Sequence, residues 1–245
     1  MPLKRTQPAT EYEEIDRWDG GVGWIAHPDE AMLRASHALA TERGDDGDGE
    51  AADGDGEENE RTDAVWVIDP VDAPGIDDLF AEFGEVAGVA VLLNRHYRDA
   101  DEIARRHDVP VYLPAWFDRV PDDITVEVRR FDDRLPGTDY RLLKVADRFG
   151  WEEGALYDET TGTLLVPESV GNARYFTTDG ERLGVHPMMR LFPPSALDGL
   201  DPERIMVGHG PGVQNDGARA LSDALGGARR RAPSLFARNL RMMLP

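Results

Sequence analysis

Short apolar runs that alternate with helical segments constrain the fold of this chain more than any other feature. The runs VWVID (65–69), GVAVLL (88–93) and VPVYL (109–113) predict buried strands. The segments between them, 75–83 and 99–107, have a helical pattern. A chain that alternates strands with helices packs those helices on a sheet. We therefore expect an α/β (α+β) architecture.

Further elements are expected on both sides of this series. Expected strands cover residues 22–25, 124–130, 140–146 and 205–207, a hairpin covers 153–166, and helices cover 30–41 and 214–226. The 245 residues, 40% of them apolar, suffice for a proper core. We therefore expect a single domain that spans residues 1–245.

Two features of the composition limit the classes of function. The chain has no cysteine, which excludes disulfides, thiolate metal sites and a cysteine nucleophile. No segment approaches the roughly 18 apolar residues that cross a bilayer, and the first residues, MPLKRTQPATEYEE, are not apolar. We therefore expect a cytoplasmic protein with no membrane span.

The charge of the chain is strongly acidic. Its 48 acidic and 27 basic residues give a net charge of −21, which repels nucleic acids and anionic membranes. Only two lysines, Lys4 and Lys144, stand beside many arginines, a composition that resembles halophilic proteins from high-salt cytoplasms. General nucleic-acid binding is therefore not expected.

Nine carboxylates lie in the segment 44–60, GDDGDGEAADGDGEENE, which has no apolar residue larger than alanine. Such a composition cannot offset the entropy lost on ordering. A calcium-binding loop needs glycine at its sixth position and a bidentate glutamate at its twelfth, and neither the register from Asp46 nor that from Asp53 supplies both. We predict a disordered, solvated insertion at about 44–62.

The residues that follow the run 88–93 carry the main functional signal. A buried strand that leads into polar residues delivers their side chains to the carboxyl edge of the sheet, where sites of α/β proteins form. The delivered residues are Asn94, Arg95, His96, Tyr97, Arg98 and Asp99. A functional site is therefore expected at this edge.

This stretch resembles the Thr-His-x-His-x-Asp-His signature of metallo-β-lactamase-fold (MBL-fold) hydrolases. The resemblance places Arg95, Tyr97 and Ala100 at the three histidine positions. Asp99 falls at the aspartate position. Only one of these four ligand types is therefore kept in this chain.

Other segments resemble the same family. Asp69 matches an aspartate that closes an early strand and has a structural role there. Trp151, in RFGWEEGALY, stands where the family has a ligand histidine. Glu168, in VPES, matches a metal-bridging aspartate, and His209, in RIMVGHGPG, matches the last ligand histidine. The resemblance implies a four-layer αββα sandwich.

The ligands that the resemblance implies are few. A dinuclear zinc site needs about five or six imidazole and carboxylate ligands. The chain offers Asp99, Glu168 and His209, with His96 one residue away from a ligand position. The permanently charged guanidinium of Arg95 would repel a metal ion and could pair with Asp99 or Glu168. We therefore expect either no cofactor or one zinc, iron or manganese ion held by Asp99, Glu168 and His209.

Each candidate residue also has a structural interpretation. Asp99 precedes a helix and fits a helix N-cap. His209 fits a histidine that is hydrogen-bonded to backbone at a strand end, and Trp151 fits the core better than a substrate platform. His96 fits a solvent-facing residue. It otherwise belongs to an expected pocket whose members are Arg95, His96, Tyr97, Arg98 and Trp151.

Two functional hypotheses follow. In the first, an MBL-fold protein has lost the dinuclear metal centre and acts as a binding or regulatory protein, with an unknown small molecule or protein as its partner. In the second, a mononuclear metal centre hydrolyses an ester, thioester or phosphoester with a metal-bound water. Arg95 or Arg98 would then bind an anionic substrate, and Tyr97 would donate to a developing oxyanion.

The end of the chain predicts a basic C-terminal helix at about 229–243. It contains Arg229, Arg230, Arg231, Arg238 and Arg241 and no acidic residue. Apolar residues recur in it at helical spacing, namely Leu235, Phe236, Leu240 and Met243. We expect this amphipathic helix to dock on the acidic surface of its own protein, or else on a partner protein, an RNA or a membrane surface.

Overall fold

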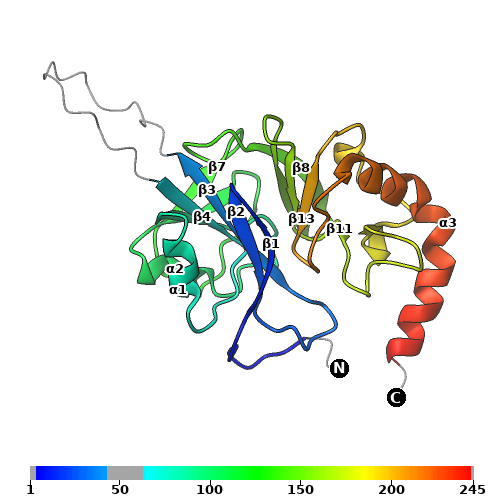
Figure 1. Ribbon diagram of the computed structural model, residues 1–245, viewed down its shortest axis with the longest axis horizontal. Coiled ribbons are helices and arrows are strands. Elements are labelled where there is room, and N and C mark those ends of the chain that lie inside the picture. Colours follow the sequence, from blue (N-terminus) through cyan, green and yellow to red (C-terminus); the bar gives the residue numbers. More distant parts are fainter. Residues whose placement is uncertain (1–3, 43–62, 244–245) are drawn as a thin grey trace, which may run out of the picture.

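Two β-sheets that pack face to face form the centre of the molecule (Figure 1). The computed structural model describes residues 4–42 and 63–243. The insertion predicted at about 44–62 therefore lies outside the described residues, and its disorder stays a prediction.

The larger sheet has seven strands, which neighbour one another in chain order. They are β1 (Glu13–Trp18), β2 (Gly21–Ile25), β3 (Ala35–Glu42), β4 (Asp63–Ile68), β5 (Glu85–Ala90), β6 (Val111–Pro114) and β7 (Val128–Phe131). Strands β1 to β4 pair antiparallel, whereas β4 to β7 pair parallel. Because parallel strands end at the same edge, the residues after β4 and β5 are delivered to one side of this sheet.

The smaller sheet has four strands in the order β13-β10-β9-β8. Their bounds are β8 (Arg141–Arg148), β9 (Trp151–Asp158), β10 (Thr163–Val166) and β13 (Arg204–Val207). Strands β10 and β13 are parallel, so the residues that follow them also share an edge. The chain between them holds the short pair β11 (Val170–Gly171) and β12 (Gly184–Val185), and the 3₁₀ helices η1 (Pro187–Met189) and η2 (Ser195–Leu197).

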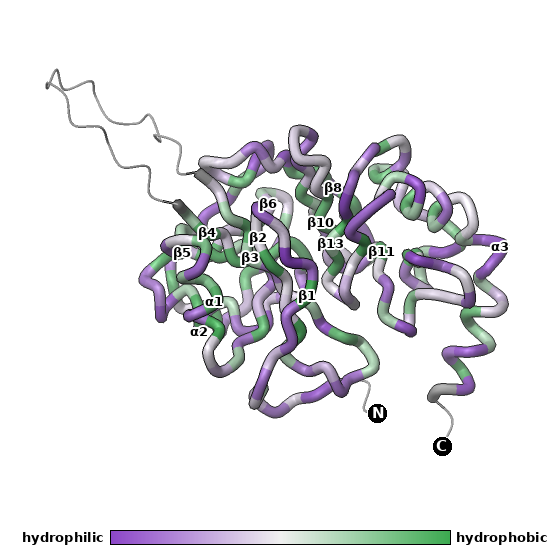
Figure 2. Tube along the Cα trace, viewed as in Figure 1, coloured by the Kyte–Doolittle hydropathy of each residue, from purple (hydrophilic) through white to green (hydrophobic). Residues whose placement is uncertain are grey.

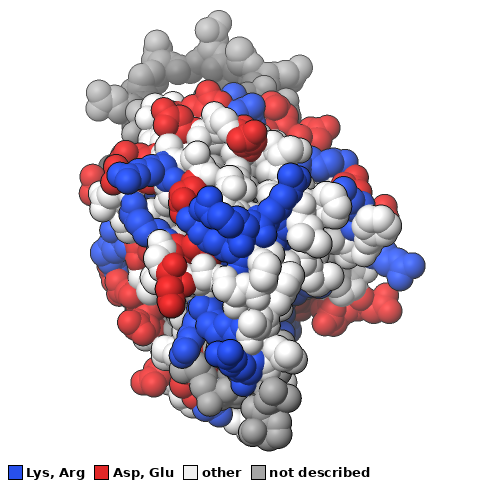
Figure 3. Space-filling model, turned by 90° about the vertical axis from the view of Figure 1, so that its right-hand side faces the viewer, with Lys and Arg blue, Asp and Glu red and all other residues white. Residues whose placement is uncertain are grey.

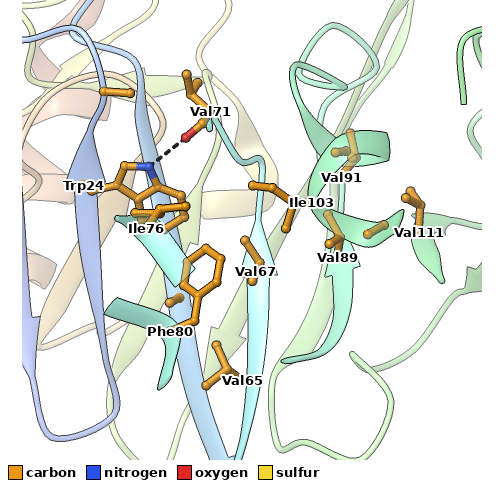
Figure 4. Packing of buried hydrophobic residues seen from close by; sticks show 14 of the residues in the cluster. Trp24, Val65, Val67, Val71, Ile76, Phe80, Val89, Val91, Ile103 and Val111 are labelled. Carbon is orange, nitrogen blue, oxygen red and sulfur yellow. Dashed lines mark hydrogen bonds between the residues drawn. The ribbon is translucent and has the colours of Figure 1, made fainter. Parts of the chain in front are cut away.

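Helices α1 (Ile76–Ala81) and α2 (Ala100–Arg106) cover the outer face of the larger sheet. Their residues Phe80 and Ile103 share a buried cluster with the strand residues Trp24 and Val67, as Figure 4 shows. The Trp24 indole N–H donates to the carbonyl of Val71 over 2.9 Å, which satisfies the one polar atom of that large side chain. This cluster is one of three large apolar cores among the described residues, beside a smaller one of Leu93, Ala146 and Trp151.

The other two cores complete the layers. Between the sheets, Ile68 and Leu165 belong to one buried cluster, and on the far side Leu221 of α3 (Gly217–Met243) packs with Leu164 of the smaller sheet. The trace is hydrophobic along the strands and more hydrophilic in the outer loops (Figure 2). The order helix, sheet, sheet, helix confirms the predicted αββα sandwich.

The helix predicted at 30–41 is wrong. Residues Ala35–Glu42 form β3, which is hydrogen-bonded to β2 on one side and to β4 on the other. The alanines of this segment favour a helix locally, but pairing with two strands outweighs that preference. Ala38 and Leu39 are fully buried on opposite faces, so β3 is a central strand.

Residues 214–226 and 229–243 do not form two helices, because α3 continues from Gly217 to Met243 and contains Pro233. Leu235 is fully buried, and Arg229 donates from Nε to the carbonyl of Leu191 over 2.9 Å. In the structure the helix therefore lies against its own protein. Figure 3 views this side of the molecule, where lysine and arginine side chains gather. Within 4–42 and 63–243, no helix is long and apolar enough to cross a membrane.

The buried cluster beneath α1 generates a stability prediction. Replacing Phe80, which is 1% exposed, by alanine should lower the free energy of unfolding by about 3–5 kcal/mol, because the change leaves a cavity in a packed core. Phe192, which is 70% exposed, is the matched control and should change stability by less than about 0.5 kcal/mol on the same substitution. Urea unfolding followed by tryptophan fluorescence measures both. Equal effects of the two substitutions would contradict this account of the core.

Candidate functional site

Three buried side chains converge where the strands of both sheets end. His96 follows β5, Glu168 follows β10 and His209 follows β13. One ligand atom from each lies within 4.8 Å of the other two. The structure thus brings together Glu168 and His209, as the sequence predicted, and adds His96 to them. His96 is only 6% exposed, so the solvent-facing alternative is wrong.

His96 is held in one tautomer by its two neighbours. Its Nδ1 lies 3.0 Å from Oδ2 of Asp69, and its Nε2 lies 3.2 Å from Nη2 of Arg98. Since a guanidinium only donates, Nε2 accepts and Nδ1 carries the proton that it donates to Asp69. Burial, with Arg98 and Arg95 adding to it, holds the pKa of His96 well below its usual range. The imidazole is therefore neutral, and its Nε2 lone pair faces the site.

Asp69 is the second residue of this arrangement and follows β4. Its Oδ1 accepts from the backbone N–H of Leu92 over 2.9 Å, so the carboxyl ties the ends of β4 and β5 together. Burial raises the pKa of Asp69 to about 7, although the charge of Arg98 opposes that rise. A buried carboxylate that orients a histidine is a common arrangement behind metal ligands. The structural role implied for Asp69 by the resemblance fits these contacts.

His209 presents a second unprotonated nitrogen. Its Nδ1 lies 3.0 Å from the carbonyl oxygen of Met32 and must donate to it, which leaves Nε2 without a proton. That Nε2 has no hydrogen-bond partner among the described residues and lies 3.9 Å from Oε1 of Glu168. Burial lowers the pKa of His209 well below its usual range. The predicted backbone hydrogen bond is present, and the other ring nitrogen stays available as a ligand.

Glu168 owes its position to a residue that the sequence did not single out. The buried carboxylate of Glu153, on β9, accepts from the backbone N–H groups of Glu168 and Ser169 over 2.8 Å each, and from the indole of Trp151 over 2.8 Å. His186, also unrecognised, places Nε2 3.7 Å from Oε1 of Glu168. A carboxylate inside an apolar strand was a visible signal for Glu153, whereas nothing in the sequence pointed to His186.

Arg98 fills the space between these groups. Its Nη1 donates to the carbonyl oxygens of Ala35 and Asp69 over 2.7 Å each, while Nη2 faces His96. No carboxylate in the described part of the chain forms an ion pair with it. Burial lowers its pKa to about 10, so the group stays cationic at neutral pH. Its backbone has φ of +43°, a left-handed conformation that is strained for arginine.

Arg95 closes the outer side of the site. Its Nη2 lies 2.8 Å from Oε2 of Glu168, which is the ion pair that the sequence analysis offered as an alternative to Asp99. Its guanidinium also lies over the ring of Trp151, with 4.1 Å between the guanidinium carbon and the ring centroid. Trp151 is 7% exposed and packs with Leu93, so it is a core residue as expected.

Two predicted site residues lie elsewhere. Asp99 is not in the cluster: its carboxylate accepts from the backbone N–H of Asp72 over 2.8 Å, and although it stands at the N-cap position of α2 its side chain makes no capping hydrogen bond. Tyr97 donates its hydroxyl proton to the carbonyl of Arg119 over 2.8 Å and lines a separate cleft with Asn94. Of the five residues of the predicted pocket, Arg95 and Arg98 line one cleft and Tyr97 lines another, whereas His96 and Trp151 line neither.

The donor set does not fit a dinuclear metal centre. Three ligand atoms converge, where two ions need about five or six. An ion bound to His96 would lie about 2.1 Å from Nε2, in the region that Nη2 of Arg98 occupies. One oxygen of Glu168 is moreover engaged by Arg95. A single ion would have to displace the guanidinium of Arg98 before it could use all three donors.

Comparisons with known proteins agree on the architecture. No family model and no curated protein matches the sequence. Among solved structures, a putative diflavin flavoprotein fragment from Nostoc sp. PCC 7120 is 11% identical with a TM-score of 0.56, covering 92% of this chain and 99% of its own. DIM-1 metallo-β-lactamase is 10% identical and the chemotaxis sensor ODP, in a peroxy diiron species, is 12% identical. Both have a TM-score of 0.53 and cover 93% of this chain and 99% of their own. With its two central sheets and the helices on both outer faces, the chain has the metallo-β-lactamase fold that the resemblance predicted.

Proposed function

We propose that this chain is an MBL-fold protein that has lost the dinuclear metal centre and acts as a binding or regulatory protein. The observation that carries this proposal is the position of Arg98. Its guanidinium lies against the free nitrogen of His96, the atom that would otherwise bind a metal ion. Backbone carbonyls of Ala35 and Asp69 hold it there.

The magnitude of the repulsion supports this choice. Two unit charges 4 Å apart repel by about 4 kcal/mol at an effective dielectric constant of about 20, so a divalent ion beside Arg98 would meet about 8 kcal/mol. Structural zinc sites with four ligands gain about 10–16 kcal/mol on binding. A site with only three donors, one of them already paired with Arg95, gains less than that, so the repulsion cancels most of its gain.

A mononuclear metal-dependent hydrolase of an ester, thioester or phosphoester is the second candidate. Two unprotonated imidazole nitrogens and a carboxylate within 4.8 Å favour it, and so does the unpartnered Nε2 of His209. The diiron state of the neighbour ODP shows that this fold holds such ions in another protein. For this chain the ligands would be His96, Glu168 and His209, without Asp99.

Metal binding separates the two candidates. Protein purified at high salt without chelator should contain far less than one zinc, iron or manganese ion per chain. Arg98→Met removes the charge and the guanidinium while keeping an unbranched apolar side chain, so it should raise the affinity for Co²⁺ by about 100-fold or more, since about 1.4 kcal/mol corresponds to tenfold. Elemental analysis and the visible absorption of bound Co²⁺ measure the two quantities. Arg105→Met, on an exposed face of α2, is the control and should change neither.

The opposite result would favour the hydrolase. Stoichiometric metal in the natural protein that disappears in His209→Ala would show that the three donors act as a ligand set despite Arg98. The proposal would then be wrong, and hydrolysis assays on ester and phosphoester substrates would follow.

The tautomers of His96 and His209 give a pH prediction. A folded-state pKa below the unfolded value of about 6.5 means that the unfolded chain binds the additional protons as the pH falls. At pH 6 both imidazoles should therefore remain neutral with the proton on Nδ1, while histidines of the urea-unfolded chain are mostly protonated. Histidine ¹⁵N NMR spectra with assignment by His96→Gln and His209→Gln test this. A protonated His209 at pH 6 would contradict its buried position.

A further inference from the structure

We infer that the cleft beside the histidine cluster binds a small molecule through a phosphate monoester group. This inference rests on the proposed function and names the ligand class of the same site. The cleft has a volume of about 870 Å³ and lies between the N-terminal segment 4–9, the loop 71–75 after β4 and the start of α2. That volume is within the range of about 300–1,000 Å³ that is usual for small-molecule sites.

Positive charge gathers in this cleft although the chain as a whole carries a net charge of −21. The cationic residues of the lining are Lys4, Arg5, Arg34, Arg95, Arg98 and Arg106. Arginines 5, 34, 95 and 106 each have a carboxylate partner. Lys4 and Arg98 have no ion pair among the residues that the structure describes. These two cations therefore have no direct carboxylate partner, although the carboxylate of Asp99 in the same lining offsets part of their charge.

The pKa of Lys4 indicates that the positive charges of the cleft act on one another. Its pKa is lowered by partial burial and then by the charges of Arg34 and Arg98, while Glu30 and Asp99 compensate only in part. Arg98 carries a further unsatisfied group, since its buried Nε has no hydrogen-bond partner. A buried donor without a partner is rare in folded proteins and calls for an acceptor. An anionic ligand in the cleft would supply a negative charge beside Lys4 and Arg98.

The number of hydrogen-bond donors on Lys4 and Arg98 favours one chemical class of anion. A carboxylate brings one negative charge, whereas a phosphate monoester brings about −1.5 to −2 at pH 7 and three acceptor oxygens. The three oxygens of the monoester can accept from Lys4 and Arg98 together, and they suit both a guanidinium and an ammonium. The cleft is larger than a phosphate, so it has room for an organic part. The carboxylates of Asp99 and Glu102 in the same lining can accept from hydroxyl groups of that part.

Ribose 5-phosphate is a suitable probe, with ribose and inorganic phosphate as references. Isothermal titration of the full chain at fixed salt should show that ribose 5-phosphate binds and that ribose does not. Lys4→Met, at an exposed position, should weaken binding by about tenfold or more, because it removes a charge-assisted contact. Lys144→Met is the control: Lys144 lies on β8, pairs with Asp147 and is not part of the cleft, so affinity should stay unchanged.

Arg98→Met provides a second variant and should abolish detectable binding, provided that its circular dichroism spectrum matches that of the natural protein. Equal affinity for ribose and ribose 5-phosphate, or unchanged affinity in Lys4→Met, would overturn the inference. Metal content is measured on the same samples. Metal-free protein that fails to bind the phosphate ester overturns only the ligand class, whereas stoichiometric metal overturns the proposed loss of the metal centre itself.

Discussion

The buried guanidinium of Arg98 joins the segments on which the site depends. It contacts Ala35 at the start of β3, Asp69 after β4 and His96 after β5, so three chain segments meet on one charged group. A charge of this kind is tolerated in a protein interior only when its donors are satisfied, and loss of one partner of such a network costs about 3–5 kcal/mol. The backbone carbonyls of Ala35 and Asp69 and the Nε2 of His96 accept from its two Nη groups, whereas its buried Nε has no partner among the described residues. The guanidinium of Arg98 therefore holds the ends of three strands in place at this edge of the sheet.

This cation changes what the edge can recognise. In the metal centre that the family resemblance implies, metal ions carry the positive charge and carboxylate ligands supply the negative charge. Here Arg95 and Arg98 bring positive charge on side chains, Glu168 is paired with Arg95, and the two histidines are neutral. A positive charge on either imidazole would be repelled by the nearby guanidinium of Arg98 and disfavoured by burial. Both effects therefore lower the pKa values of His96 and His209. The same fold thus presents an edge that favours anions.

Sequence patterns predicted most of the frame and only part of the site. Apolar runs predict strands whose side chains are buried on both faces, and the residues after such strands lie at the edge, where the structure brings Glu168 and His209 close together. The segment 30–41 was assigned wrongly because its alanines favour a helix and the partners of β3 are distant in sequence. In the loop 94–99 the resemblance placed the ligand positions at Arg95, Tyr97 and Asp99, whereas the residue that joins the cluster is His96. Arg98 in this loop has a left-handed backbone, His96 belongs to the histidine cluster and Asp99 does not, and no motif reveals a positive φ.

The charge of the protein affects an anionic ligand differently at long range and inside the cleft. A net charge of −21 repels an anion at long range, but salt at about 1 M shortens the screening length to about 3 Å, so this repulsion fades. Contacts inside the cleft are screened much less, because Arg98 is buried and only short distances are involved. Recognition of an anion by this acidic molecule therefore depends on a few direct contacts with the cations of the cleft, of which Arg98 is buried and Lys4 exposed. For that reason an acidic surface and an anion-binding cleft are compatible. Salt weakens surface ion pairs, and it also screens the repulsion between the acidic surface and an anion that approaches the cleft.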